Sequence, residues 1–288
     1  MALLGWAARA TLIRLGRPCY TVIMYVDVVD LRDFYETRLG QVARRMIRRR
    51  LRLIWPDLRG MRLLGLGYAA PYLRIFRDEA ERAVAVMPSS QGVLAWPQEG
   101  PNAVALADEG ELPLQDYSID RVLLVHGLEF SEQARPLLKE IWRVMAGGGR
   151  LVVVVPNRRG IWARIDNTPF GQGHPYTASQ LSRVLRESGF TPERVTAALF
   201  APPTASRMLL RSAAWIERIG ERWFTTFAGV SVIEASKQIY AKPALKRKES
   251  RQPAYLPVPH GAPRWSRVLT APLPRAGEGG AQRAALGG

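Results

Sequence analysis

A short glycine-containing stretch is the first candidate for chemistry in this sequence. Gly65-Leu-Gly67-Tyr68-Ala-Ala70 follows a strand-like run and precedes a segment with helical character. Glycines at such a junction let the backbone approach a cofactor at the N-terminus of the helix. The spacing also satisfies the G-x-G-x-x-A pattern of nicotinamide-dependent enzymes, and an ordinary tight turn can carry two glycines. Other residues must therefore decide which cofactor this loop would hold.

A nicotinamide-dependent enzyme would place an acid at the end of the next strand, about twenty residues later, to accept the ribose hydroxyls. The corresponding strand here ends in Met87-Pro88. Glu81 precedes that strand and would lie at its opposite end. A nicotinamide-dependent dehydrogenase therefore ranks last among the functions considered.

Histidine and cysteine give little support for a metal site. The histidines, at 126, 174 and 260, lack metal-ligand spacing, and Cys19 is the sole cysteine, so no disulfide or thiolate site can form within one chain. A reducing, cytoplasmic setting is expected from this cysteine usage. His126 closes a strand-like run at the edge where parallel sheets bind ligands, so it either lines the ligand or caps the strand.

Apolar runs of strand length alternate with helix-period segments along the chain. This alternation is typical of βαβ units, and runs without polar interruption are typical of strands covered on both faces. The sequence therefore predicts an α/β fold with a mostly parallel, seven-stranded sheet and helices on both faces. The predicted strands are 61–67, 82–87, 103–107, 121–125, 151–155, 195–199 and 230–240.

The first predicted helix spans 31–55, with Asp30 as its N-cap and Pro56 preventing its continuation. It carries an arginine run that could contact phosphates or lipid headgroups, although arginines on the outer face of an amphipathic helix are more often simply solvated. The solvated face is the favoured interpretation. The run comprises Arg44, Arg45, Arg48, Arg49, Arg50 and Arg52.

Three later helices are expected. An amphipathic helix over 134–145 should pack on the sheet and end at the triple glycine 147–149, since glycine supplies the left-handed conformation common after a helix. Thr177 and Gln180 form a capping box that opens the next helix, and Gly189 closes it. A helix over 205–223 follows.

Several segments, in one order along residues 60–160, resemble the class I S-adenosylmethionine-dependent methyltransferases of the small-molecule type 11 group, which have a Rossmann-like fold. The resemblance rests on the loop around Gly67, the amphipathic helix with its glycines, and three further segments. These are Ala107-Asp108-Glu109-Gly-Glu-Leu-Pro-Leu114, Asp120-Arg-Val-Leu-Leu-Val-His126-Gly-Leu-Glu129 and the strand ending in Val155-Pro156-Asn157.

The resemblance implies S-adenosylmethionine as cofactor. It implies that Gly67 passes the methionine moiety and that Asp108 meets the adenine amino group, a donor that a carboxylate can accept. This requires a nucleoside-sized cavity where the loop around Gly67 meets Asp108. The implied cofactor-binding residues are Gly65, Gly67, Tyr68, Asp108, Glu109 and His126.

The cofactor loop departs from the family pattern. The family reads Asp-x-Gly-x-Gly-x-Gly, whereas the matching positions here hold Gly65, Gly67, Ala69 and Pro71, so the acid and two of the glycines are replaced. Pro71 is tolerated if it falls in the first helical turn. The acid expected at the end of the second strand is replaced by Met87, which removes a charged acceptor worth about 1.5–3 kcal/mol.

Methyl transfer to a small molecule is the first functional hypothesis, with the segment 158–176 covering the substrate or merely clamped to the domain. A catalytically silent scaffold or partner subunit is the alternative that the altered loop keeps open. A nucleic-acid or membrane-surface binder using the arginine run is the third. No catalytic residue is assigned, and the oligomeric state and methyl acceptor are not predicted.

The net charge of +16 is concentrated at the chain ends. Residues 243–288 carry eight basic against two acidic side chains, so nucleic acid is not favoured as a partner of the central region. Arginines interrupt the N-terminal apolar stretch, so no transmembrane segment is expected. The expected organisation is an extension over 1–23, for which a start at Met24 or a targeting role are alternatives, a helical segment over 24–58, a methyltransferase domain over 59–242, and a disordered tail over 243–288.

Overall fold

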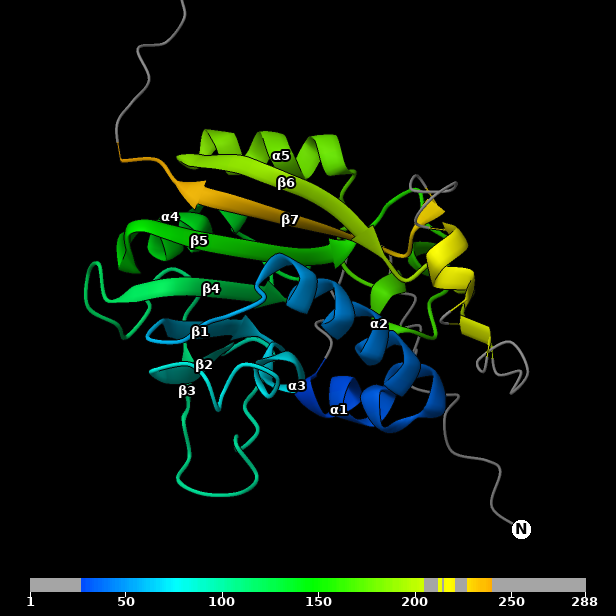
Figure 1. The fold of residues 1–288 in the computed structure, drawn as a ribbon, viewed down its shortest axis with the longest axis horizontal. Helices are drawn as coiled ribbons and strands as arrows, with labels where there is room; N and C mark the ends of the chain where they lie inside the picture. Colours follow the sequence, from blue (N-terminus) through cyan, green and yellow to red (C-terminus); the bar gives the residue numbers. More distant parts are fainter. Residues whose placement is uncertain (1–26, 205–211, 214, 221–226, 240–288) are drawn as a thin grey trace, which may run out of the picture. The chain divides into compact units, whose positions relative to one another are not determined.

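The computed structural model describes residues 27–204, 212–213, 215–220 and 227–239. The predicted N-terminal extension, the C-terminal tail and much of the predicted helix over 205–223 lie outside the described residues. Within the described part, the chain forms a seven-stranded sheet with helices on both faces (Figure 1). No helix there is long and apolar enough to cross a membrane.

The sheet confirms the predicted fold class. Its strand order is β3-β2-β1-β4-β5-β7-β6, with β7 antiparallel to both neighbours and the other pairs parallel. The order reverses between β1 and β4, and ligands of such sheets bind at the carboxyl ends of strands near that reversal. The strands are β1 (Arg62–Gly67), β2 (Arg82–Pro88), β3 (Val104–Ala107), β4 (Ile119–Val125), β5 (Met145–Pro156), β6 (Phe190–Ala198) and β7 (Val230–Lys237).

The prediction of one helix over 31–55 is wrong, because two helices occupy this stretch: α1 (Val28–Glu36) and α2 (Arg38–Ile54). Thr37 separates them with an extended backbone, and its hydroxyl accepts a hydrogen bond from the N–H of Gly40. The bend is so tight that a β-carbon on Gly40 would lie 2.1 Å from the carbonyl oxygen of Phe34. The N-cap of the first helix is Asp27 rather than Asp30.

The triple glycine does not close α4 (Ala134–Val144) as predicted. The helix ends earlier, and the glycines lie inside β5. The pairing of β4 with β5 changes register between Ile119 and Arg121, opposite these glycines, and Gly148 has a φ of +82°. The glycines therefore accommodate a bulge in the strand rather than the end of a helix.

The capping box at the start of α5 (Ala178–Glu187) is confirmed. The Thr177 hydroxyl accepts from the N–H of Gln180, whose side-chain oxygen accepts from the N–H of Thr177. Gly189 follows the helix with a φ of +83°, as expected for a residue that ends it. The chain then enters β6 at the outer edge of the sheet, where Pro192 lies at an irregularity in the pairing with β7.

Each face of the sheet has its own hydrophobic core. Side chains of α1, α2 and the short α3 (Ala70–Leu73) fill one core with the sheet, and those of α4 and α5 fill the other. Leu137, Leu138 and Ile141 are buried, which confirms the predicted inner face of α4. The helices α1 and α2 are thus packed directly on the sheet, and they cover the ends of its strands.

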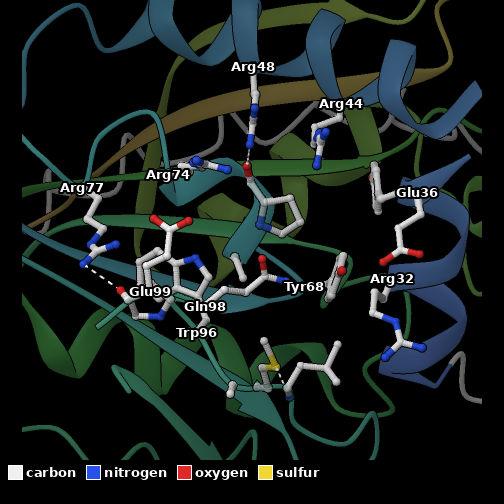
Figure 2. Close-up of a pocket in the computed structure, with 17 residues that line it drawn as sticks. Arg32, Glu36, Arg44, Arg48, Tyr68, Arg74, Arg77, Trp96, Gln98 and Glu99 are labelled. Carbon is white, nitrogen blue, oxygen red and sulfur yellow. Dashed lines mark hydrogen bonds between the residues drawn. The ribbon is translucent and has the colours of Figure 1, made fainter. Parts of the chain in front are cut away.

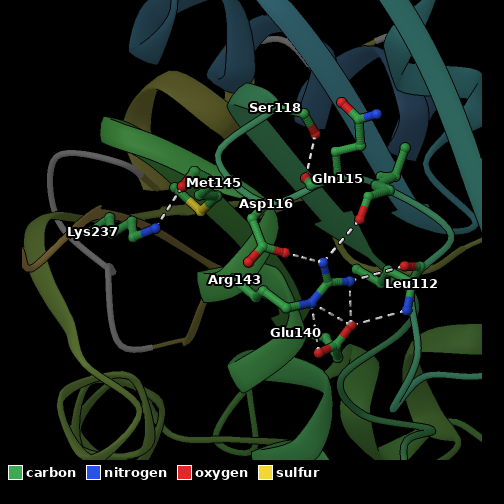
Figure 3. A network of polar contacts seen from close by, with 9 residues as sticks. Leu112, Gln115, Asp116, Ser118, Glu140, Arg143, Met145 and Lys237 are labelled. Atoms are coloured by element: carbon green, nitrogen blue, oxygen red, sulfur yellow. Dashed lines mark hydrogen bonds and ion pairs between the residues drawn. The ribbon is translucent and has the colours of Figure 1, made fainter.

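Arg143 joins α4 to the loop that follows β3 (Figure 3). Its guanidinium donates to the carbonyl oxygens of Leu112 and Leu114 at 3.0 and 2.9 Å and to the carboxylates of Asp116 and Glu140 at 2.5 and 2.7 Å. These partners raise the pKa of Arg143, the side-chain hydrogen bond from Glu140 being the largest cause. The loop carrying Asp108 is therefore held on the helix at its far end.

Replacing Arg143 with lysine should lower the free energy of unfolding by about 1–2 kcal/mol, because an ammonium group cannot reach two carbonyls and two carboxylates at once. Urea denaturation followed by circular dichroism would measure this loss. The matched control is Arg135→Lys, whose exposed side chain pairs with Glu187 among the described residues, and the expected change there is below about 0.5 kcal/mol. Equal losses in both variants would contradict the proposed anchoring role.

Candidate functional site

The glycines of the loop after β1 are required by the packing of the chain itself. Gly67 has a φ of +68°, and a β-carbon there would lie 2.4 Å from the carbonyl oxygen of Val125 at the end of β4. A β-carbon on Gly65 would lie 2.6 Å from Leu73 and 2.9 Å from the β-carbon of Ala69. Close contact between chain segments therefore accounts for both glycines, whether or not a ligand approaches the loop.

Asp108 and Glu109 lie beside Gly67 and line one small pocket with it, as the family resemblance implied. The Asp108 carboxylate accepts from the N–H of Gly110 at 2.8 Å, which makes a local turn. Glu109 accepts from the hydroxyl of Ser131, and burial raises the pKa of Glu109. The cavity enclosed here is only about 10 Å³, because the side chains of Leu112, Leu124 and Leu137 line it closely. That is room for about one water molecule, and the nucleoside-sized cavity expected beside Asp108 is not open in this structure.

His126 neither lines a cavity nor simply caps its strand. It is buried with a φ of +50°, and its ring binds two partners. Its Nε2 lies 2.7 Å from the hydroxyl of Tyr35 on α1, and its Nδ1 lies 3.0 Å from Oε1 of Glu129. Its carbonyl oxygen also accepts from the side chain of Gln91 at 2.6 Å. His126 therefore joins the end of β4 to the covering helix.

A second tyrosine extends this buried chain. The hydroxyl of Tyr72 on α3 donates to that of Tyr35 at 2.7 Å. Burial is the main cause that raises the pKa of both tyrosines, well above the ordinary value for Tyr35, so both keep their protons at neutral pH. Tyr35 then donates to Nε2 of His126, which leaves Nδ1–H to donate to Glu129. The chain of donors links α3, α1 and β4.

Sequence reasoning missed Tyr35 and Glu129. Glu129 lies in the family-like segment 120–129 but was assigned no role there, and Tyr35 lies in the predicted first helix, where only the arginines were considered as ligand contacts. The signal was present for Tyr35, because it follows Leu31 by four residues and shares the apolar face of α1. Its contact with a histidine 91 residues away could not be read from spacing.

The large cavity of the molecule opens over the carboxyl ends of β1 and β2 (Figure 2). Its volume is about 440 Å³, which falls in the range of roughly 300–1,000 Å³ found for small-molecule sites. The loop Tyr68–Pro71 and the segment 94–99 form opposite sides, and α1 and α2 cover it. Of the six residues implied as cofactor contacts, only Tyr68 lines this cavity.

Tyr68 reaches the cavity by stacking on the buried chain. Its ring lies over that of Tyr35 with centroids 5.7 Å apart and an interplanar angle of 21°. Burial raises the pKa of Tyr68 to about 12, although the nearby charges of Arg32 and Arg44 act in the opposite direction. Tyr68 therefore presents a neutral hydroxyl-bearing ring to whatever occupies the cavity.

Two positions that depart from the family pattern, one in the cofactor loop and one at the end of β2, line the same cavity. Pro71 lies in the first turn of α3, as expected, and its carbonyl oxygen accepts from Nε of Arg48 at 2.8 Å. Met87 is buried at the end of β2, and its sulfur lies 3.5 Å from the N–H of Leu94. At the end of the second strand, where the family has an acid, this chain has the apolar side chain of Met87.

The segment after β5 is clamped to the domain. Trp162 is buried and donates from Nε1 to the carbonyl oxygen of Ala201 at 2.8 Å, and the ring of Phe170 lies 5.0 Å from that of His126. Arg158, Arg159 and Arg164 are exposed. Within the described residues, the aromatic side chains of this segment serve packing, and none of the large cavity's lining comes from it.

Comparison with known proteins agrees with this architecture. A family model described as a methyltransferase domain matches residues 64–153, from β1 into β5. The demethylmenaquinone methyltransferase of Thermus thermophilus is 27% identical over 161 residues, which cover 55% of this chain and 66% of that protein. The matched region thus spans slightly less than two thirds of the relative's length.

Solved structures share the fold at low sequence identity. A methyltransferase from Thermotoga maritima superposes with a TM-score of 0.52 at 17% identity, covering 73% of this chain and 96% of the other. A chain from the complex of the Trm112 methyltransferase activator with a methyltransferase of Haloferax volcanii gives 0.53 at 15% identity, covering 73% and 97%.

The chain carries a class I methyltransferase domain. The cofactor of this class is S-adenosylmethionine. The described structure fits this cofactor only in part. The large cavity has the size of a cofactor site and borders the loop after β1. The space beside Asp108, in contrast, has no room for adenine while Leu112 and Leu137 stay where they are. Adenine contact at Asp108 and Glu109 therefore stays a prediction that requires these side chains to move.

Proposed function

We propose that this methyltransferase domain transfers a methyl group from S-adenosylmethionine to a small-molecule acceptor. The match of residues 64–153 to the methyltransferase family carries the proposal. A cavity of about 440 Å³ at the carboxyl ends of β1 and β2 supports it, because ligands of such sheets bind at this edge. The catalytically silent scaffold is not favoured, since the family match includes the strands and loops that surround the site.

The chain's own contribution to this reaction is positioning. S-Adenosylmethionine supplies an already activated methyl group, so a dedicated base is optional and holding the acceptor in line is the main requirement. The loop Tyr68–Pro71 and Met87 form the wall nearest the strand ends, and α1 and α2 contribute further side chains to the lining of the cavity. Tyr35 and Tyr72 tie α1 and α3 to β4 through His126 and thereby fix the shape of the wall.

Calorimetric titration of the full chain with S-adenosylmethionine tests the proposal. We expect binding, and we expect Asp108→Asn to weaken it by about tenfold if the adenine amino group is held by this carboxylate. Asp116→Asn is the matched control, because this acid is on the same loop but bonds to Arg143. Absence of binding at millimolar cofactor would contradict the proposed function. Equal affinity in all three proteins would remove Asp108 from the site and leave the function standing.

A further inference from the structure

The large cavity has a strongly cationic wall. Arg44 and Arg48 lie one turn apart on α2, Arg74 follows α3, and Arg32 and Arg77 stand at the rim, whereas the acids lining the cavity are Glu36 and Glu99 (Figure 2). Five guanidinium groups against two carboxylates leave an excess of positive charge around the cavity. The expectation of a solvated arginine face is therefore wrong for Arg44 and Arg48, although Arg45 and Arg49 on the same helix are exposed.

Of the five arginines that line the cavity, only Arg32 forms an ion pair with a described carboxylate. Arg32 pairs with Asp33 at 2.9 Å, and Arg77 donates to the carbonyl oxygen of Glu99 at 3.4 Å. Arg52, farther along α2, pairs with Glu79. Neither Arg44 nor Arg74 forms an ion pair with any of the described carboxylates. Their charges are available to a ligand.

The arginines also repel one another. Arg48 is half-buried, and the pKa of Arg48 is lowered chiefly by burial and then by the positive charges of Arg44 and Arg74. Arg48 donates to the carbonyl oxygen of Pro71, and Figure 2 shows Arg44, Arg48 and Arg74 on the same side of the cavity. Like charges held together without a counter-charge destabilise the fold, and a bound anion would relieve this repulsion.

We propose that the cavity binds an acceptor through a phosphate group held by Arg44, Arg48 and Arg74. Guanidinium groups match the geometry of phosphate oxygens, and several of them can share one dianion. The cofactor itself is a poor match for this wall, because its sulfonium and ammonium groups outweigh its carboxylate. The proposal rests on the proposed function, to which it adds the chemical class of the acceptor: a phosphorylated small molecule.

Titration calorimetry with inorganic pyrophosphate on the full chain tests the site directly. We expect saturable binding that weakens by at least about tenfold in Arg44→Gln/Arg74→Gln, since each charged hydrogen bond is worth about a tenfold change. The matched control is Arg45→Gln/Arg49→Gln, which removes the same charge from the exposed side of α2 and should bind as the unaltered protein does. Equal weakening in both pairs would overturn the proposal, because it would reveal only general attraction of anions. Arg74→Gln alone, at an exposed position, gives a second variant that should weaken binding if the double variant misfolds.

Competition separates this inference from the proposed function. Pyrophosphate should bind with unchanged affinity when S-adenosylmethionine is present at saturation. Mutual exclusion would overturn the inference, because the arginines would then hold the cofactor carboxylate. Pyrophosphate binding without any binding of S-adenosylmethionine would support the anion site and contradict methyl transfer. Binding to vesicles of phosphatidylglycerol that depends on Arg44 and Arg74, with none to free pyrophosphate, would overturn the small-molecule class in favour of a lipid headgroup.

Discussion

Gly67→Ala should destabilise the domain by about 2–5 kcal/mol in the absence of any ligand. The added methyl group would lie 2.4 Å from the carbonyl oxygen of Val125, and the residue would keep a left-handed backbone with φ near +68°. The left-handed conformation costs about 1–2 kcal/mol, and overpacking against rigid backbone costs about 1–3 kcal/mol more. Chemical denaturation of the cofactor-free protein measures the sum.

Gly148→Ala separates these two costs. Gly148 also has a left-handed φ, of +82°, but a β-carbon there meets no atom within 4 Å. We therefore expect a loss of only about 1–2 kcal/mol from the backbone conformation. If Gly67→Ala were no more costly than Gly148→Ala, the close approach of β1 to β4 would not be what requires Gly67. If Gly67→Ala is the more costly variant, destabilisation alone would explain a loss of its activity. That loss would then be no evidence that Gly67 contacts the cofactor.

Tyr35→Phe should lower the free energy of unfolding by about 2–5 kcal/mol. The change removes one hydroxyl that accepts from Tyr72 and donates to His126, and it leaves the Tyr72 hydroxyl and Nε2 of His126 buried without this hydrogen bond. Each buried polar group left unsatisfied costs about 1–3 kcal/mol. Thermal and urea denaturation of the full chain would both report the loss.

The matched control for this prediction is Tyr72→Phe. That variant removes only the outer donor, while Tyr35 still donates to His126, so the expected cost is about 0.5–1.5 kcal/mol. In the double variant the two costs should not add, because the Tyr72 hydroxyl has no acceptor once Tyr35 is phenylalanine. Similar costs for the two single variants would show that the hydrogen-bonded chain is not continuous.

The sheet could be predicted because its strands are nearly uninterrupted apolar runs separated by helix-period segments. The ends of elements were harder to predict. The break at Thr37 was signalled by a threonine followed by Gly40, yet the apolar periodicity continues across it, since α1 and α2 both pack on one core. The triple glycine was assigned to the end of α4 because glycine suits a helix terminus and a strand bulge equally.

The candidate site could be located but not resolved from sequence. Strand ends place Gly67, Asp108 and His126 at one edge, and the structure brings them there. The space between them is filled by Leu112, Leu124 and Leu137. These leucines come from three separate parts of the chain, so sequence spacing does not show that they meet. The arginine run could be recognised in the sequence. Which of its arginines line the cavity and which face solvent depends on how α2 lies over α3, and no local sequence pattern determines that arrangement.

The strand β6 forms one outer edge of the sheet. Pro192 lacks an N–H group, and the neighbouring Glu193 and Arg194 are exposed and charged. An edge with a proline, a pairing irregularity and charged side chains is a poor template for adding a further strand from another chain. Aggregation through continuation of the sheet is therefore disfavoured on this flank, even at the high concentrations that crystallisation demands.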